Sequence, residues 1–269
     1  MPHLFVFGLG YSASRLARRL ADEGTAGRGW TVEGTGRAGA IRFEDDAAVR
    51  AALGRATHIL SSVPPGDSGD PVLARYGAAI AGAPAGWIGY LSSTGVYGDT
   101  GGAWVDESAP VGGGRRSARV VADAAWQALG RAVHVFRLPG IYGPGRSVLE
   151  RIREGRARRI ALPGQVFSRV HVDDIAGGVI AGMRGPAGVY NLADDLPCPQ
   201  NDLIAYGCAL LGLPMPPLQT LAEAGLSPAA AAFYAENRRV ANGKAKRLLG
   251  WRLRYPDYRA GLRGVAGQG

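Results

Sequence analysis

The chain has 269 residues, of which 46% are hydrophobic, and a formal net charge of +9. This length suffices for one large α/β domain with a smaller lobe. The chain lacks the roughly 18 to 20 consecutive apolar residues of a membrane helix, and its start lacks the basic region of a signal peptide. We therefore expect a cytoplasmic protein with no membrane partner.

The cysteines and the basic residues exclude further classes of site. Cys198 and Cys208 lack metal or redox spacing, so we expect reduced thiols and no metal site. The positive charge comes mostly from arginines dispersed along an alanine- and glycine-rich chain, whereas a nucleic-acid surface would cluster them. The composition predicts no nucleic-acid partner but allows a preference for anionic ligands.

Short apolar runs alternate with helical stretches along the first two thirds of the chain. The predicted strands are 4–7, 30–35, 58–62, 87–92, 133–138 and 189–192. The predicted helices between them are 12–23, 47–53, 71–82, 116–129 and 173–183. This α/β alternation predicts a doubly wound parallel sheet, a Rossmann fold, with ligands bound beyond the carboxyl ends of the strands.

The pattern changes after Gly143, where proline and glycine separate short helices near 199–211, 228–236, 242–249 and 256–265. We expect residues 1–143 to form the dinucleotide-binding domain, to which 169–193 returns. Residues 144–168 and 194–269 are then expected to form a smaller, C-terminal substrate lobe.

A glycine-rich turn follows the first predicted strand. Gly8, Gly10 and Ala13 form a GxGxxA pattern that opens a helix, with Tyr11 and Ser12 between the last two. Such glycines let backbone amides approach a pyrophosphate at the positive end of a helix. We predict a dinucleotide site here, although an ordinary glycine-rich connection has the same local sequence.

Arg37 follows the second predicted strand, in the sequence Gly-Thr-Gly-Arg. A site for NAD would be expected to offer a carboxylate to the ribose 2′-hydroxyl near this point, whereas an arginine suits a 2′-phosphate. The sequence thus favours NADP, with NAD as the alternative cofactor and a solvated loop arginine as the alternative role.

A second motif ends the fourth predicted strand, where residues 92–99 read SSTGVYGD. This segment resembles extended short-chain dehydrogenases/reductases of the epimerase/dehydratase type. Other segments resemble that family in the same order along the chain: VDE at 105–107, RLPGIYGPG at 137–145, RVHVDDIA at 169–176, YNLA at 190–193, NRRVAN at 237–242 and LGW at 249–251. A homodimer is plausible on this resemblance.

The resemblance implies roles for individual residues. Ser93 matches the residue that hydrogen-bonds the reacting oxygen. Further cofactor contacts are implied for Ser61, Ser62, Val63, Pro139 and Ile141, and substrate contacts are expected from Thr94, Tyr142, Arg146 and Arg169. His171 is expected to be a packed structural residue, Glu107 to support the site, and Asp173 and Asp174 to cap the following helix.

The chain departs from the family at the catalytic Tyr-x-x-x-Lys pair. Aligning Asp123 with an acid of the family places Arg115 at the tyrosine position and Arg119 at the lysine position, and no tyrosine lies between Tyr97 and Tyr142. An arginine stays protonated and cannot act as a general base, but the two could bind an anion, and Arg119 could bind ribose.

Other placements and proton donors stay open. Arg115 and Arg119 could instead face solvent, with Arg119 paired to Asp123 four residues on. Tyr97 or Tyr142 could replace the missing tyrosine if a nearby positive charge lowered its pKa.

Two functional classes follow from these residues. The first is an atypical NADP-dependent oxidoreductase or epimerase/dehydratase-like enzyme that acts on a small anionic substrate. The second is a cofactor-binding protein that has lost its chemistry and senses NADP(H). A nucleic-acid binder is the weakest alternative, and it would require strongly salt-dependent binding to DNA.

Overall fold

The computed structural model describes residues 1–23, 29–114 and 117–267. A six-stranded parallel sheet runs in the order β10-β6-β4-β3-β1-β2. Its strands are β1 (His3–Phe7), β2 (Thr31–Gly34), β3 (His58–Ser61), β4 (Trp87–Ser93), β6 (Val133–Leu138) and β10 (Gly188–Asn191). The predicted doubly wound parallel sheet is confirmed, and these are the six strands that the apolar runs predicted.

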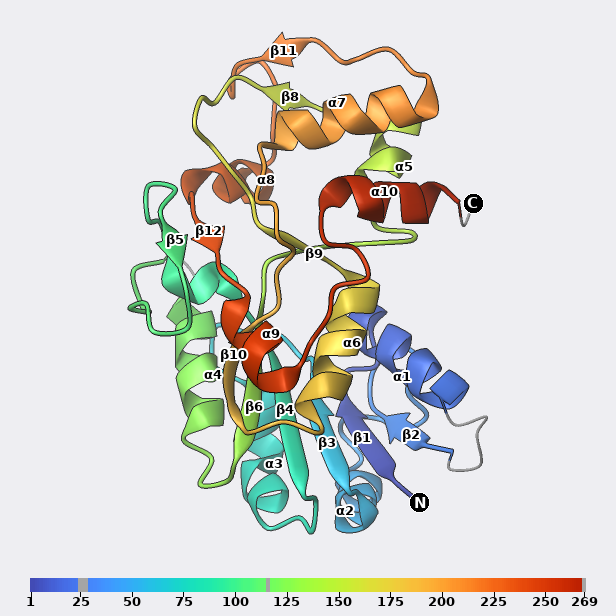
Figure 1. Ribbon diagram of the computed structural model, residues 1–269. Coiled ribbons are helices and arrows are strands. Elements are labelled where there is room, and N and C mark those ends of the chain that lie inside the picture. The colour runs from blue at the N-terminus through green and yellow to red at the C-terminus, as the bar shows by residue number, and fades with distance from the viewer. Residues whose placement is uncertain (24–28, 115–116, 268–269) are drawn as a thin grey trace.

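The side chains of β1 show why helices cover both faces of the sheet. Leu4 and Val6 belong to one buried cluster and Phe5 and Phe7 to another, because successive side chains of a strand point to opposite faces. Helices α1 (Tyr11–Glu23) and α6 (Val172–Gly182) contribute to the first cluster. Helices α2 (Asp46–Arg55), α3 (Pro71–Ala81) and α4 (Ser117–Gln127) contribute to the second. Figure 1 shows the two helical layers on either side of the sheet.

The chain changes direction across the sheet at β1. Strand β2 pairs with one edge of β1 and β3 with the other, so the connections that leave β1 and β3 turn to opposite sides. Such a switch point opens a crevice beyond the carboxyl ends of the strands. Local signals fix the helices around it: Asp45 caps α2 by accepting from one backbone amide of the first turn, and Asp70 caps α3 by accepting from two.

A third buried cluster lies beyond the carboxyl end of the sheet, in the upper half of Figure 1. It is built by α5 (Val148–Arg153), α7 (Gln200–Leu211) and α10 (Tyr258–Ala266), and it includes both cysteines, which are free thiols. Helix α9 (Gly243–Leu249), which precedes α10 in the C-terminal segment, packs elsewhere. It adds Ala245 to the core on the face of the sheet that α1 and α6 cover.

Short strand pairs and turns connect the sheet to this third cluster. They are β5 (Trp104–Val105) with β12 (Arg239–Val240), β7 (Gly140–Tyr142) with β9 (Arg169–His171), and β8 (Arg159–Ile160) with β11 (Leu218–Gln219). The remaining elements are the 3₁₀ turn η2 (Thr94–Tyr97), α8 (Pro228–Ala231) and the 3₁₀ turn η3 (Ala232–Ala235). No helix in the described part of the chain is long and apolar enough to cross a membrane.

Candidate active site

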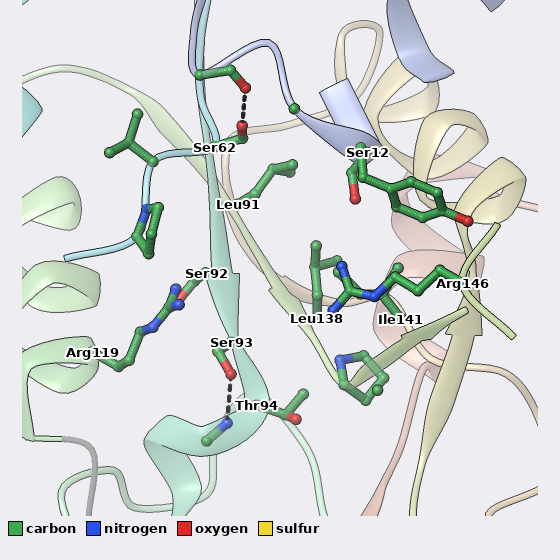
Figure 2. Close-up of a pocket in the computed structure, with 18 of the residues that line it drawn as sticks. Ser12, Ser62, Leu91, Ser92, Ser93, Thr94, Arg119, Leu138, Ile141 and Arg146 are labelled. Atoms are coloured by element: carbon green, nitrogen blue, oxygen red, sulfur yellow. Dashed lines mark hydrogen bonds between the residues drawn. The ribbon is translucent and has the colours of Figure 1, made fainter. Parts of the chain in front are cut away.

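A pocket of about 1220 Å³ lies at the carboxyl end of the sheet and extends from the glycine turn to the segment 232–240. This volume exceeds the roughly 300 to 1,000 Å³ of a pocket for one small ligand. Predicted site residues that line the pocket are Gly8, Gly10, Tyr11, Ser12, Arg37, Ser62, Val63, Ser93, Thr94, Arg119, Pro139, Ile141 and Arg146. Figure 2 labels lining residues from α1, from the ends of β3, β4 and β6, and from α4, together with Ile141 and Arg146.

The glycine turn is shaped for a ligand that needs backbone amides. Gly8 has a φ of +86°, and a Cβ there would lie 3.0 Å from Cγ2 of Val63. The Ser62 hydroxyl donates to the Gly8 carbonyl at 2.5 Å, which fixes the turn against β3. Helix α1 starts at Tyr11 with no acidic residue in its first turn, so its positive end is free to face an anion. This donor set fits a pyrophosphate.

Two arginines line the pocket near the glycine turn: Arg37 follows β2, and Arg18 lies on α1. Arg37 follows Gly36, whose φ of +104° lets the chain turn closely past Leu9. Arg37 and Arg18 both line the pocket and are exposed, and within the described chain neither has a carboxylate partner. They form a cationic end of the pocket.

The hydroxyl groups at the carboxyl end of β4 differ in whether they are available to a ligand. Ser92 donates to Oδ2 of Asp123 at 2.5 Å and is therefore committed to the protein interior. The Ser93 Oγ accepts from the Gly95 amide at 3.1 Å, which leaves the hydroxyl proton available to a ligand. Thr94 begins the 3₁₀ turn η2 beside it and also lines the pocket.

Arg119 lies on α4 and points its guanidinium toward the strand end at Ser92 (Figure 2). Its positive charge opposes the rise in the pKa of the Tyr90 hydroxyl that burial causes. The alternative pairing of Arg119 with Asp123 is not found in the described chain, and both oxygens of Asp123 bind the buried Arg137, at 2.8 and 3.1 Å. Arg115, the other arginine of the departed motif, lies outside the described residues.

Tyr97 is placed in a buried network rather than in the pocket. Its hydroxyl donates to Oδ1 of Asn191 at 2.8 Å and accepts from Nη1 of Arg137 at 3.0 Å. Burial raises the pKa of Tyr97 despite the adjacent guanidinium, so the phenol stays neutral. Glu107 supports the same network, since its Oε1 accepts from the backbone N–H of Asn191 at 2.7 Å.

Tyr142 and Arg169 also lie away from the pocket lining. Tyr142 packs in the third cluster, where burial raises the pKa of its hydroxyl. Arg169 is buried and donates to the carbonyls of Phe167 and Cys198 and to Oε1 of Gln200, at 2.9 to 3.1 Å. Ser61 and Ala13 are buried next to the pocket and are not part of its lining.

The side chain of Tyr11 contributes a phenol to the pocket wall. The glycine motif had predicted only backbone contacts from this turn. Its hydroxyl donates to the Pro144 carbonyl at 3.0 Å, and the Arg146 guanidinium lies 5.7 Å from the centre of its ring. Burial raises the pKa of Tyr11, and the charges of Arg146 and Arg15 only partly oppose this. The aromatic residue directly after Gly10 was the available sequence signal.

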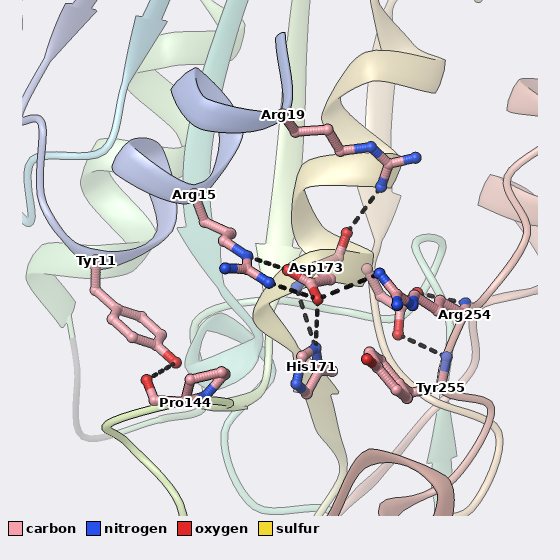
Figure 3. Close-up of polar contacts among 9 residues, drawn as sticks. Tyr11, Arg15, Arg19, Pro144, His171, Asp173, Arg254 and Tyr255 are labelled. Carbon is pink, nitrogen blue, oxygen red and sulfur yellow. Dashed lines mark hydrogen bonds and ion pairs between the residues drawn. The ribbon is translucent and has the colours of Figure 1, made fainter. Parts of the chain in front are cut away.

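The acidic residues at the start of α6 bind other segments instead of capping the helix (Figure 3). The N-cap is His171, whose Nδ1 accepts from the Asp173 amide at 3.2 Å. Asp173 pairs with Arg15 of α1, and Asp174 accepts from the amides of Arg254 and Tyr255, at 2.6 and 3.1 Å.

His171 is completely buried in this cluster. Burial lowers its pKa to about 4, so the imidazole is neutral and structural. The expectation of a packed His171 is met. The two aspartates lie in the first turn of α6, where their charge was expected, but the N-cap is His171, and longer-range partners bind the aspartate carboxylates.

The far end of the pocket is formed by residues that were not predicted as site residues. Phe233, Glu236 and Arg238 line it together with Phe167. Arg238 pairs with Glu236 at 2.8 Å and also donates to the Gly98 carbonyl. Among the described residues, no group of histidine, cysteine and acidic side chains could hold a metal ion.

The fold and pocket define a class, a Rossmann-fold protein with a nucleotide-type site at the sheet's switch point. The human epimerase family protein SDR39U1, solved with NADPH, shares this fold at a TM-score of 0.78 and 19% identity, over 99% of this chain and 100% of that one. Solved structures with the same fold are NAD(P)-dependent epimerase and short-chain dehydrogenase/reductase proteins.

The chain belongs to the same family as a functionally unknown conserved protein from Silicibacter pomeroyi DSS. The two are 44% identical, with a TM-score of 0.88, over 100% of this chain and 99% of that one. No protein-family model matches the chain. The matches to curated relatives span about half of their length: a Streptomyces 3-diazoavenalumate denitrifying reductase is 31% identical over 143 residues, 48% of this chain and 45% of that protein.

Proposed function

We propose that the protein is an NADP(H)-dependent reductase that acts on a small anionic acceptor. The observation that carries the proposal is a single pocket that combines the glycine turn, a cluster of arginines and two strand-end hydroxyls. Solved neighbours contain NADPH or NAD, and one curated relative is named a reductase, which supports both parts of the proposal.

The residues around the glycine turn would hold the cofactor. The amides at the start of α1 would bind the pyrophosphate, and Arg37 with Arg18 would bind a 2′-phosphate. Pro139 and Ile141, which line the middle of the pocket, would flank the nicotinamide, and Arg119 would contact ribose. The absence of an acidic residue from the first turn of α1 keeps this end of the pocket favourable for phosphate.

A dihydronicotinamide held by these residues would supply a hydride, and the acceptor would then gain two electrons and one hydrogen and take a proton from water. Ser93 and Thr94 would donate hydrogen bonds to negative charge that develops on the acceptor. Arg119 would add a fixed positive charge at the same strand end. Each of these groups stabilises an anion, and none of them accepts a proton.

This donor set favours reduction over epimerisation. Oxidation of a sugar hydroxyl, the first step of a redox epimerase, requires a general base for the hydroxyl proton. Tyr97 and Tyr142 lie outside the pocket lining, and an arginine cannot serve as a base. A site that donates hydride without first removing a proton is consistent with these residues.

The proposal is tested by following NADPH consumption at 340 nm across a panel of organic acids, ketones, enones and nucleotide sugars. We expect NADPH oxidation with at least one anionic acceptor, and a Ser93→Ala variant with roughly 10²-fold lower turnover. NADPH binding without turnover on the whole panel would contradict an enzyme and favour an NADP(H) sensor.

A further inference from the structure

The pocket extends well beyond the cofactor-binding end, and its far part has a distinct chemistry. We propose that the acceptor is a planar, conjugated organic carboxylate whose flat body lies against Phe233 and whose carboxylate binds Arg146. The inference rests on the proposed function, since it names the acceptor that the same pocket would take.

Arg146 is a cation of the pocket wall, beside Tyr11 at the start of α1, and it remains available to a ligand. Arg238 is occupied by Glu236 at 2.8 Å and by the Gly98 carbonyl, and Arg37 lies at the glycine turn. Arg146 is exposed, extends into the pocket in Figure 2, and has no carboxylate partner within the described chain. Its stacking on the Tyr11 ring at 5.7 Å orients the guanidinium, whose fork suits a carboxylate.

Phe233 provides an apolar surface in the same pocket. Its side chain is 53% exposed, although it is a large aromatic residue. The ring rests on Phe167, with the centroids 5.8 Å apart, and Phe167 is held by the edge of Tyr234 and by the Arg169 guanidinium behind it. A firmly backed but exposed ring gains most from a ligand with a flat apolar face.

The polar groups of the pocket restrict the reaction further. Among its described lining residues, the pocket holds no histidine, lysine, cysteine or aspartate, and its carboxylate, Glu236, is paired with Arg238. The Tyr11 hydroxyl already donates to Pro144. The acceptor should therefore carry its own electron sink. The hydride would form one C–H bond as a conjugated double bond opens, and the electron pair of that bond would delocalise into the conjugated system. Water would then protonate the resulting carbanion.

The first experiment measures binding to the protein saturated with NADP⁺, which cannot reduce the ligand. Calorimetric titrations compare trans-cinnamate with 3-cyclohexylpropanoate, cinnamamide, cinnamyl phosphate and UDP-glucose. We expect cinnamate to bind at least about tenfold more tightly than the saturated acid and the neutral amide. Equal affinity for cinnamate and the saturated acid, or tighter binding of cinnamyl phosphate or UDP-glucose, would overturn the inference.

The second experiment assigns the two contacts. Arg146→Gln should weaken cinnamate about tenfold or more and Phe233→Leu a few-fold, while the exposed arginine outside the pocket, changed in Arg252→Gln, serves as the matched control. NADP⁺ affinity measured in the same variants should stay unchanged. Unaltered cinnamate affinity in Arg146→Gln would refute the carboxylate site even with NADP⁺ bound, whereas a wild-type protein that binds no NADP⁺ would refute the proposed function itself.

Discussion

Arg37 is the residue on which cofactor choice depends most directly. It lies at the exposed edge of the glycine turn and has no carboxylate partner within the described chain. We expect Arg37→Ser to weaken NADPH about tenfold and to leave NADH unchanged, because a charge-assisted contact to a phosphate contributes about 1.4 kcal/mol. Fluorescence titrations of both cofactors measure this. Arg42→Ser, at an exposed arginine outside the pocket, is the control, and equal losses for NADPH and NADH would contradict the assignment.

Tyr97 has a structural role, because its buried hydroxyl binds Arg137 and Asn191 next to the pocket. We expect Tyr97→Phe to lower the free energy of unfolding by about 1 to 3 kcal/mol, since Arg137 and Asn191 each lose a buried partner. NADPH affinity should stay within twofold of wild type. Urea denaturation and a cofactor titration check the two halves, and an unchanged stability with abolished turnover would instead make Tyr97 a catalytic residue.

The candidate site was only partly predictable at this scale. The glycine turn, Arg37 and Ser93 follow directly from strand ends, and the structure brings them to one pocket. The placement of Tyr97 depends on Arg137 and Asn191, which are 40 and 94 residues further along the chain. No local pattern encodes partners at such separations, and a loop side chain can leave a strand end in either direction.

At the scale of elements, the turn between β1 and α1 contains one glycine that matters for stability and another that matters for cofactor binding. We expect Gly8→Ala to cost about 1 to 2 kcal/mol of stability, because its φ is +86° and a Cβ would press on Val63. Gly10→Ala should change stability by less than about 1 kcal/mol, since the nearest atom to its Cβ is 3.9 Å away. It should still weaken NADPH by crowding the pyrophosphate.

Chemical denaturation and NADPH titration of the two glycine variants give the comparison. Tight NADPH binding by Gly10→Ala would show that this turn does not receive the pyrophosphate.

Most of the strands and helices could be predicted from local sequence patterns. Continuous apolar runs bounded by glycine and proline predicted the six strands because a parallel sheet is buried on both faces. The start of α6 was less predictable: an Asp-Asp pair before a helix normally suggests caps. Here α1 and the segment at 254–255 compete for those carboxylates, and only the folded chain brings them within reach.

For the whole molecule, a buried acid between the sheet and the third cluster links stability to pH. Burial raises the pKa of the Asp194 carboxyl group to about 8, although the charge of Arg169 opposes this rise. The folded state then holds a proton that an unfolded aspartate, with a pKa of about 4, releases. Its contribution is present below about pH 4 and is lost as the pH rises through 8.

The corresponding prediction concerns Asp194→Asn, which mimics the protonated acid. Wild type should lose at least about 1 kcal/mol more stability than the variant between pH 4 and pH 8. Unfolding in urea at several pH values provides the measurement. A parallel pH dependence of the two proteins would show that Asp194 does not bind this proton in the folded state.

The central claim for the whole molecule is that the pocket at the sheet's switch point binds NADP(H). Its most direct test is a calorimetric titration of the wild-type protein with NADPH and, separately, with NADH. We predict one NADPH bound per chain, at least about tenfold more tightly than NADH. No binding of either cofactor, or tighter binding of NADH, would contradict the account.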